Sequence, residues 1–145
     1  MKKTALLLCA LSVAGSANVL ASQAPVHPWG KGPFRVLLEV NQDNPKTWKL
    51  AIANLATMEK VVGMDSAHAE VIAWGPGLKM LMKHSPVAKD IKSLSMYGVQ
   101  FSACGQTMKH LHVSKSQLAG GVTVVPGAMA EIVRRHAQGW AEIKE

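Results

Sequence analysis

The residues best suited to covalent chemistry lie in the stretch from Val99 to His112, which reads VQFSACGQTMKHLH. Cys104 stands near its centre and is followed at once by a glycine and a polar run. The only other cysteine in the sequence, Cys9, lies in an N-terminal segment that we expect to be removed. Such an unpaired cysteine is a reactive thiol, half of a bond to another chain, or an inert buried side chain.

The position of Cys104 favours a reactive thiol. The apolar run at 99–103 predicts a strand, and the run from Gly105 predicts a helix. Unpaired backbone amides of Gly105, Gln106 and Thr107 would then point back towards the sulfur. Together with the helix dipole, such amides lower a cysteine pKa from about 8.5. They can also bind a small anion, including the outer sulfur of a persulfide. The alternative is that Gly105 only relieves a tight turn.

No histidine is an obvious base for this thiol. His110 lies six residues along the predicted helix, a rise of about 9 Å that is too long for a hydrogen bond. His84 and a residue of another subunit are the remaining candidates for a base. His136 lies on the apolar stripe of the last predicted helix and is expected to be packed. His68 is expected at the start of the second strand, opposite the thiol.

Methionines and histidines gather in two parts of the chain and could form a copper-binding surface in an exported protein. These residues are Met80, Met82, His84, Met108, His110 and His112. Their spacing fits no tight pattern, and methionine is a common core filler, so we predict no metal site and no cofactor. The sequence lacks the motifs of dinucleotide-binding proteins, P-loop proteins, serine hydrolases and zinc proteases.

The N-terminus predicts export. Two lysines precede the apolar stretch Ala5–Ala14, which is too short to span a bilayer, and small residues before Ser22 fit a cleavage site. We therefore assign residues 1–21 to a signal peptide and place the mature chain in the periplasm; a retained anchor is the weaker alternative. Prolines and glycines at 22–33 predict an irregular arm, and 34–145 predict one domain. No second apolar stretch is long enough for a transmembrane helix, so we expect no stable membrane association.

The charge of the mature chain is mildly positive. Without Lys2 and Lys3, the 16 basic residues become 14 against 9 acidic residues, for a net charge of +5. Basic residues are spread along the chain, with one adjacent arginine pair at Arg134 and Arg135, and no basic run carries interleaved aromatic residues. This distribution indicates an ordinary solvated surface and argues against nucleic acid as a partner.

Strand-like and helix-like segments alternate four times. Apolar runs predict strands at 34–40, 69–74, 99–103 and 122–125. Helices are predicted from the Asn44 cap to Gly63, at 78–84, after Pro86, at 105–112, and from Gly127 through Ile143. Strands that are apolar throughout are typical of a parallel sheet with helices on both faces. If the strand order is 2-1-3-4, Asn41 and Cys104 meet where the order reverses and ligands bind.

Three segments resemble the DsrE/DsrF-like family, in particular its small stand-alone branch. They are FSACGQTM at 101–108, GVTVVPG at 121–127 and AEIVRRHAQGW at 130–140. The resemblance implies a flavodoxin-like three-layer α/β sandwich with about four or five mainly parallel strands, assembled as a trimer or hexamer. It also implies sulfur handling, in which the family's cysteine, matched by Cys104, carries sulfur as a persulfide. Gln106 stands where relatives often have asparagine, and the export signal is unlike the cytoplasmic sulfur-relay members.

The leading hypothesis is a periplasmic sulfur carrier or sulfurtransferase in which Cys104 accepts sulfane sulfur and passes it to a thiol. Its partner would be a small sulfur species or a thiol protein. A small anion, such as the outer sulfur of the persulfide, would be held by Gly105, Gln106, Thr107 and Asn41. One alternative is a non-catalytic ligand-binding or assembly module in which Cys104 is structural. The other is a copper or redox protein that uses Cys104 with methionine and histidine ligands.

Overall fold

The computed structural model describes residues 32–63 and 65–145, so the predicted signal peptide and most of the arm at 22–33 lie outside the described residues. The strands are β1 (Phe34–Val40), β2 (Ala67–Ala73), β3 (Gln100–Cys104), β4 (Val122–Val125) and β5 (Ala141–Lys144). The α-helices are α1 (Pro45–Val62), α2 (Ala88–Met96), α3 (Gly105–His110) and α4 (Ala128–Ala137). Two 3₁₀ helices, η1 (Gly75–Leu81) and η2 (Lys115–Gln117), complete the described elements.

Within the described residues, five strands pair in parallel in the order β4-β3-β2-β1-β5. The prediction of a parallel α/β sheet is confirmed, but the order 2-1-3-4, which was assumed in placing Asn41 beside Cys104, does not occur because β2, not β1, lies beside β3. The chain builds the sheet in one direction from β1 to β4 and then returns to the opposite edge with β5. The strand order therefore reverses between β1 and β5, away from Cys104.

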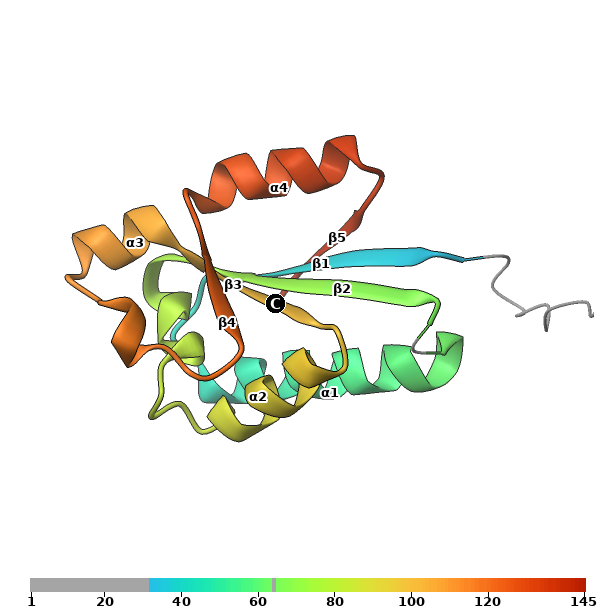
Figure 1. Ribbon diagram of the computed structural model, residues 1–145, viewed down its shortest axis with the longest axis horizontal. Helices are drawn as coiled ribbons and strands as arrows, with labels where there is room; N and C mark the ends of the chain where they lie inside the picture. Colours follow the sequence, from blue (N-terminus) through green and yellow to red (C-terminus); the bar gives the residue numbers. More distant parts are fainter. Residues whose placement is uncertain (1–31, 64) are drawn as a thin grey trace, which may run out of the picture.

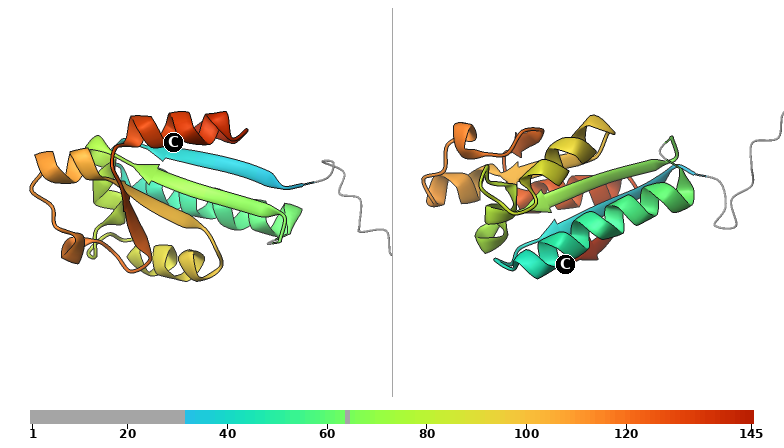
Figure 2. Two further views of the ribbon diagram at one scale, coloured as in Figure 1. Left: turned by 45° about the horizontal axis from the view of Figure 1, so that its top comes forward. Right: turned by 90° about the horizontal axis from the view of Figure 1, so that it is seen from below.

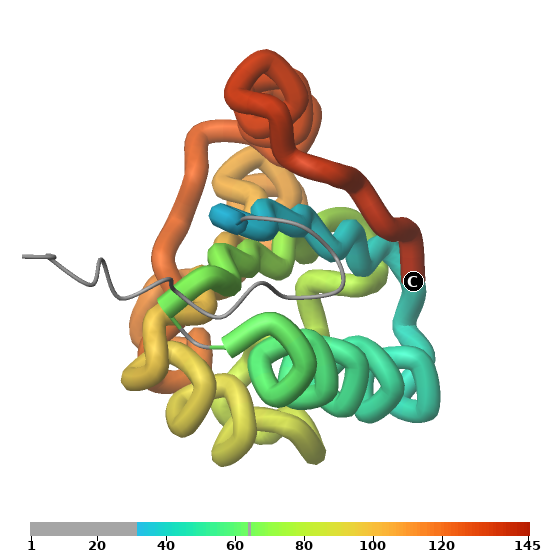
Figure 3. Tube along the Cα trace, turned by 90° about the vertical axis from the view of Figure 1, so that its right-hand side faces the viewer, coloured from blue at the N-terminus to red at the C-terminus, as the bar shows by residue number. Residues whose placement is uncertain are grey.

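Helices cover both faces of the sheet and give three layers (Figure 1). The helices α1 and α2 lie on one face, and α4 lies on the other, as the view along the sheet in Figure 3 shows. Right-handed crossovers require this arrangement, because the connection from β4 to β5 runs in the opposite direction to the earlier ones. The segment with α3 and η2 lies beyond the carboxyl ends of the strands (Figure 2).

The two faces of the sheet have unequal cores. Alternate residues of a strand point to opposite faces, so Leu38 and Val40 join the large core under α1 and α2. Leu37 belongs to a small cluster under α4 that also contains Ile72, Cys104, Ala128 and Ile132. The buried polar residues are Glu39, Glu70, Ser102 and Glu131. The three that come from strands share the α4 face with Leu37, so that face is more polar.

The predicted ends of the first helix are confirmed. Asn44 Oδ1 accepts a hydrogen bond from the amide of Lys46 at 3.1 Å, and Pro45 begins the helix. Gly63 ends it with a φ of 82°, in the left-handed region that glycine adopts most easily. Neither α1 nor any other helix of the described residues is long and apolar enough to cross a membrane.

The last helix is shorter than the sequence predicts. Helix α4 ends at Ala137, and the chain continues into β5, so Trp140 and Ile143 lie outside the helix. Gly139, with a φ of 77°, turns the chain back towards the sheet. The segment predicted as a helix at 78–84 also differs, since it forms η1 and begins at the glycine–proline run.

Two further expectations, the buried apolar stripe of the last helix and the packing of His136, are wrong. The predicted apolar stripe is only partly buried, because Met129 and Val133 are 57% and 67% exposed. The side chain of His136 is 47% exposed rather than packed, and its Nε2 lies 2.7 Å from a carboxylate oxygen of Glu142. His68, in contrast, lies at the start of β2 as predicted.

Candidate functional site: a thiol between two helix starts

Cys104 ends β3 and is the N-cap residue of α3, as predicted. Its backbone is extended, so the chain changes from strand to helix at this residue. The residue is 5% exposed, and it is the free cysteine of the described part of the chain. Trp74 and Val125 pack at the edge of its apolar cluster. The sulfur therefore lies at the carboxyl edge of the sheet but is largely shielded from solvent.

A second helix start faces the sulfur. The amide of Ala128, the first residue of α4, donates a hydrogen bond to Cys104 Sγ at 3.3 Å. The register explains this contact, because Cys104 pairs with Val125 at the end of β4, directly before the loop into α4. The N-termini of α3 and α4 thus meet at one atom, and both favour negative charge there. Both helix starts were predicted from the sequence, but only the start of α3 was expected to face the sulfur; the contact from Ala128 was not.

Burial raises the pKa of the Cys104 thiol, but hydrogen bonds outweigh this effect and leave the pKa below its ordinary value. The groups that lower it are the Thr107 hydroxyl and the backbone amides of Thr107, Ala128 and Gln106. Such donors bind a thiolate more strongly than a neutral thiol. The site therefore favours the nucleophilic form of the sulfur.

Thr107 is held in place for its contact with the sulfur. Its Oγ1 accepts a hydrogen bond from the amide of Gly75, at the start of η1, at 3.0 Å. A hydroxyl carries one proton, and this proton remains available to Cys104 while the oxygen accepts from Gly75. The loop after β2 thereby orients a side chain of α3.

Thr107→Val tests this arrangement, because it removes the hydroxyl and keeps the shape of the side chain. We expect the pKa of Cys104 to rise and the alkylation rate at neutral pH to fall by about fivefold, the equivalent of one hydrogen bond of roughly 1 kcal/mol. The matched control is Thr107→Ser, which retains the hydroxyl. Equal alkylation rates in the valine and serine variants would show that the hydroxyl does not act on the sulfur.

Gly105 lets α3 begin against the loop between β4 and α4. A Cβ at this position would lie 2.9 Å from the carbonyl oxygen of Val125 and 3.4 Å from that of Pro126. The close approach of the two chain segments therefore requires glycine here. Of the three amides predicted to act on the sulfur, those of Gln106 and Thr107 do so, and Gly105 contributes through its missing side chain.

The structure does not bring Asn41 beside the thiol. Strand β2 lies between β1 and β3, so the ends of these two strands are two strand spacings apart, about 10 Å. Asn41 lies instead against η1, where a Cβ on Gly77 would come within 2.8 Å of its Cα. The expectation of Asn41 as an anion ligand depended on the order 2-1-3-4 and loses its geometric basis.

A cavity of about 600 Å³ opens beside the thiol site, between η1 and α3. Its lining residues are Gly75, Pro76, Lys79, Gln106, Thr107, His110 and Leu111. Thr107 belongs to both the cavity and the surroundings of the sulfur. Lys79 Nζ lies 2.5 Å from Asp43 Oδ2 in a solvent-exposed ion pair. The cavity is large enough for a small organic thiol.

The methionines and histidines proposed for copper do not form one surface. Met80 and Met108 are packed in the core, at 0% and 6% exposure. His84, His110 and His112 are exposed. Within residues 32–63 and 65–145, no group of three or more His, Cys, Asp or Glu side chains could hold a metal ion. The geometry therefore gives the copper hypothesis no support.

The fold and this site define a class of small α/β proteins with a cysteine at the carboxyl edge of a parallel sheet. The family model described as the DsrE/DsrF-like family matches residues 36–144. The chain belongs to this family, as its resemblance predicted. The match lies within the domain predicted at 34–145.

Two solved structures have a similar fold. A protein of unknown function from Methanobacterium thermoautotrophicum is 30% identical, with a TM-score of 0.73, over 77% of this chain and 99% of that chain. A conserved protein of unknown function from Bacteroides thetaiotaomicron is 18% identical, with a TM-score of 0.58, over 76% of this chain and 93% of that chain. The fold is thus a flavodoxin-like α/β sandwich. None of the curated proteins matches the chain.

Proposed function

We propose that the protein carries sulfane sulfur as a persulfide on Cys104. The observation that carries this proposal is the group of donors around Sγ, which come from two helix starts and from Thr107. Membership of a family associated with sulfur relay supports it. These donors favour a thiolate in the unloaded protein, and the two helix N-termini also favour the negative charge of a persulfide.

Sulfur transfer at this site needs no oxidant or reductant. The Cys104 thiolate attacks the outer sulfur of a donor persulfide, R–S–SH. The S–S bond of the donor breaks, RS⁻ leaves, and Cys104 becomes a persulfide. An acceptor thiolate then attacks that outer sulfur, forms its own persulfide and releases the Cys104 thiolate. Each step exchanges one S–S bond for another, as in thiol–disulfide exchange.

The surroundings of Cys104 limit the partners. The residue is 5% exposed, which favours a small sulfur species as donor. Loading extends the reach of the site by one S–S bond, about 2 Å, so a partner thiol protein can accept from the persulfide more easily than it can contact the thiolate. The predicted export signal supports a periplasmic location, and the family resemblance supports a homo-oligomer, as a trimer or hexamer.

Exposure of the folded protein to polysulfide tests the proposal. We expect mass spectrometry to find one added sulfur atom on Cys104 and to find it lost when glutathione is added. Failure of Cys104 to gain sulfur while the protein remains folded would overturn the sulfur-carrier function.

The low exposure of Cys104 also favours a second candidate, a non-catalytic binding module in which the cysteine is structural. In that case Cys104→Ser should leave ligand binding and oligomer size unchanged. The thiol should also titrate at or above about 8.5, the value of an unperturbed cysteine.

A further inference from the structure

We propose a second ligand site, for an organic anion that carries a planar ring, at the amino end of the sheet on the α4 face. A cavity of about 560 Å³ lies there. Its side chains include Arg35, His68, Gln100, Arg135, Gln138 and Trp140. In the strand direction it lies at the opposite end of the sheet from Cys104. The cavity shares no lining residue with the one beside Thr107.

Unequal strand lengths create this cavity. Strands β1 and β2 have seven residues each, whereas β3 has five and β5 has four. Pairing with β3 begins only at Glu70 of β2, and pairing with β5 begins only at Val36 of β1. The first residues of β1 and β2 therefore extend past both neighbours, and α4 ends at Ala137 without covering them (Figure 1).

On the α4 face, the uncovered strand ends carry an arginine and a histidine rather than apolar side chains. Arg35 and His68 are partners in the register of β1 and β2, and both are exposed. Among the described residues, Arg35 forms no ion pair with a carboxylate. A guanidinium of this kind beside an imidazole suits the two oxygens of a carboxylate or phosphate.

Arg135, the second arginine of the cavity, forms part of its wall and does not compete with Arg35 for a bound anion. Arg135 Nε lies 2.5 Å from Glu70 and 3.0 Å from Glu131, so its charge is already balanced. Its Nη2 donates to Gln100 Oε1, which leaves the amide protons of Gln100 for a ligand. Arg35 is therefore the cation that a bound anion would meet.

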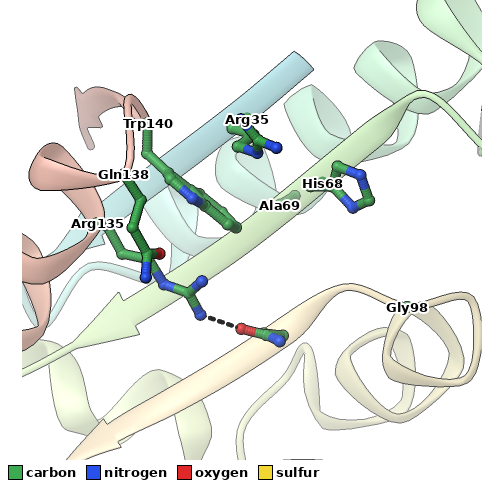
Figure 4. Close-up of a pocket in the computed structure, with 8 residues that line it drawn as sticks. Arg35, His68, Ala69, Gly98, Arg135, Gln138 and Trp140 are labelled. Atoms are coloured by element: carbon green, nitrogen blue, oxygen red, sulfur yellow. Dashed lines mark hydrogen bonds between the residues drawn. The ribbon is translucent and has the colours of Figure 1, made fainter. Parts of the chain in front are cut away.

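Trp140 supplies a flat apolar wall. The Arg135 guanidinium carbon lies 4.2 Å from the centroid of the Trp140 ring, which fixes the indole from one side. Figure 4 shows Trp140 and Arg135 reaching the cavity from the α4 side, while Arg35 and His68 come from the strands. A fixed indole beside a cation is suited to a planar ring with an anionic group attached.

The size of the cavity argues for an organic ligand. A volume of about 560 Å³ lies within the range of sites for small organic molecules. An inorganic anion would contact Arg35 and leave the rest of the cavity, including the indole wall, unused. The ligand chemistry is thus an aromatic carboxylate or a nucleoside phosphate.

Binding of benzoate and of adenosine 5′-monophosphate tests the site, with the Trp140 indole N–H followed by NMR and assigned through Trp140→Phe. We expect at least one of the two to shift this signal. We also expect Arg35→Gln to weaken that binding at least about tenfold, as for a lost charge-assisted hydrogen bond. The matched control is Lys89→Gln, which removes an exposed cation from α2 and should bind like the unaltered protein.

Three results would overturn this second site: no shift with either ring-bearing anion at millimolar concentration, unchanged affinity in Arg35→Gln, or inorganic phosphate binding as tightly as the ring-bearing anions. Sulfur loading of Cys104 should be unaffected by Arg35→Gln. Failure of the second site is therefore distinguishable from failure of the sulfur-carrier function.

Discussion

Cys104→Ser is expected to abolish sulfur loading completely. Serine keeps the size of the side chain and an acceptor for the Ala128 amide, which lies 3.3 Å from the sulfur in the present structure. Its hydroxyl does not ionise in the accessible pH range and forms no persulfide. Intact-protein mass spectrometry after polysulfide exposure should find the added sulfur in the unaltered protein and none in the variant.

The control for this experiment lies in the N-terminal segment. Cys9 is the only other cysteine of the full sequence. In the precursor, before the predicted cleavage, Cys9→Ser should therefore load sulfur like the unaltered chain. Circular dichroism should find both variants folded. Sulfur loading in Cys104→Ser, or its loss in Cys9→Ser, would contradict the assignment of the carrier to Cys104.

Arg135→Met is expected to lower the free energy of unfolding by about 3–5 kcal/mol, because breaking a buried ion pair leaves a charge without a partner. The carboxylates that depend on Arg135 are 1% exposed in Glu70 and 9% exposed in Glu131. Glu70 Oε2 receives no hydrogen bond and relies on the charge of Arg135 at 2.5 Å. Burial already raises the pKa of Glu70 above its ordinary value, and loss of Arg135 would raise it further.

Arg134→Met is the matched control for this prediction. Arg134 is adjacent in the sequence and also contacts Glu131, but its side chain is 48% exposed. Solvent screens such a pair, so the expected loss is below about 1 kcal/mol. Denaturant-induced unfolding measures both variants. A loss below about 1 kcal/mol in Arg135→Met would show that the buried carboxylates do not need this arginine.

The class of fold could be predicted from the sequence, but the order of the strands could not. The runs at β1 and β2 have the same burial pattern along their seven residues. Either strand could therefore occupy the position beside β3, because the hydrophobic pattern records burial and not neighbours. Contacts between strands distant in the sequence decide the order, and Asn41 was misplaced for this reason.

The location of the fifth strand was missed for a different reason. Strand β5 has four residues and lies at an edge of the sheet, where only one of them is partly buried. Trp140 and Ile143 are three residues apart, a spacing that also fits one face of a helix. Only pairing with β1 from Val36 to Glu39 fixes this segment as a strand.

The part of the thiol site that comes from β3 and α3 was predictable from the sequence. The part that comes from the start of α4 was partly predictable. The strand end and helix start around Cys104 follow from one continuous stretch of sequence. The Ala128 amide belongs to a residue 24 positions after Cys104 in the sequence. Its approach could have been inferred, because the loops that follow adjacent parallel strands open on the same edge. The Gly75–Thr107 hydrogen bond depends on side-chain packing and left no signal in the sequence.

The pH dependence of Cys104 alkylation measures most directly whether the fold holds this sulfur as a thiolate. The rate is followed on the Cys104 peptide by mass spectrometry, in the folded protein and in denaturant. The inflection is the readout, since burial slows the absolute rate in the folded protein at every pH. Because the hydrogen bonds lower the thiol pKa, the folded protein should show its inflection at a lower pH than the denatured chain, which should titrate at about 8.5. An inflection at or above that of the denatured chain would contradict an activated sulfur at Cys104.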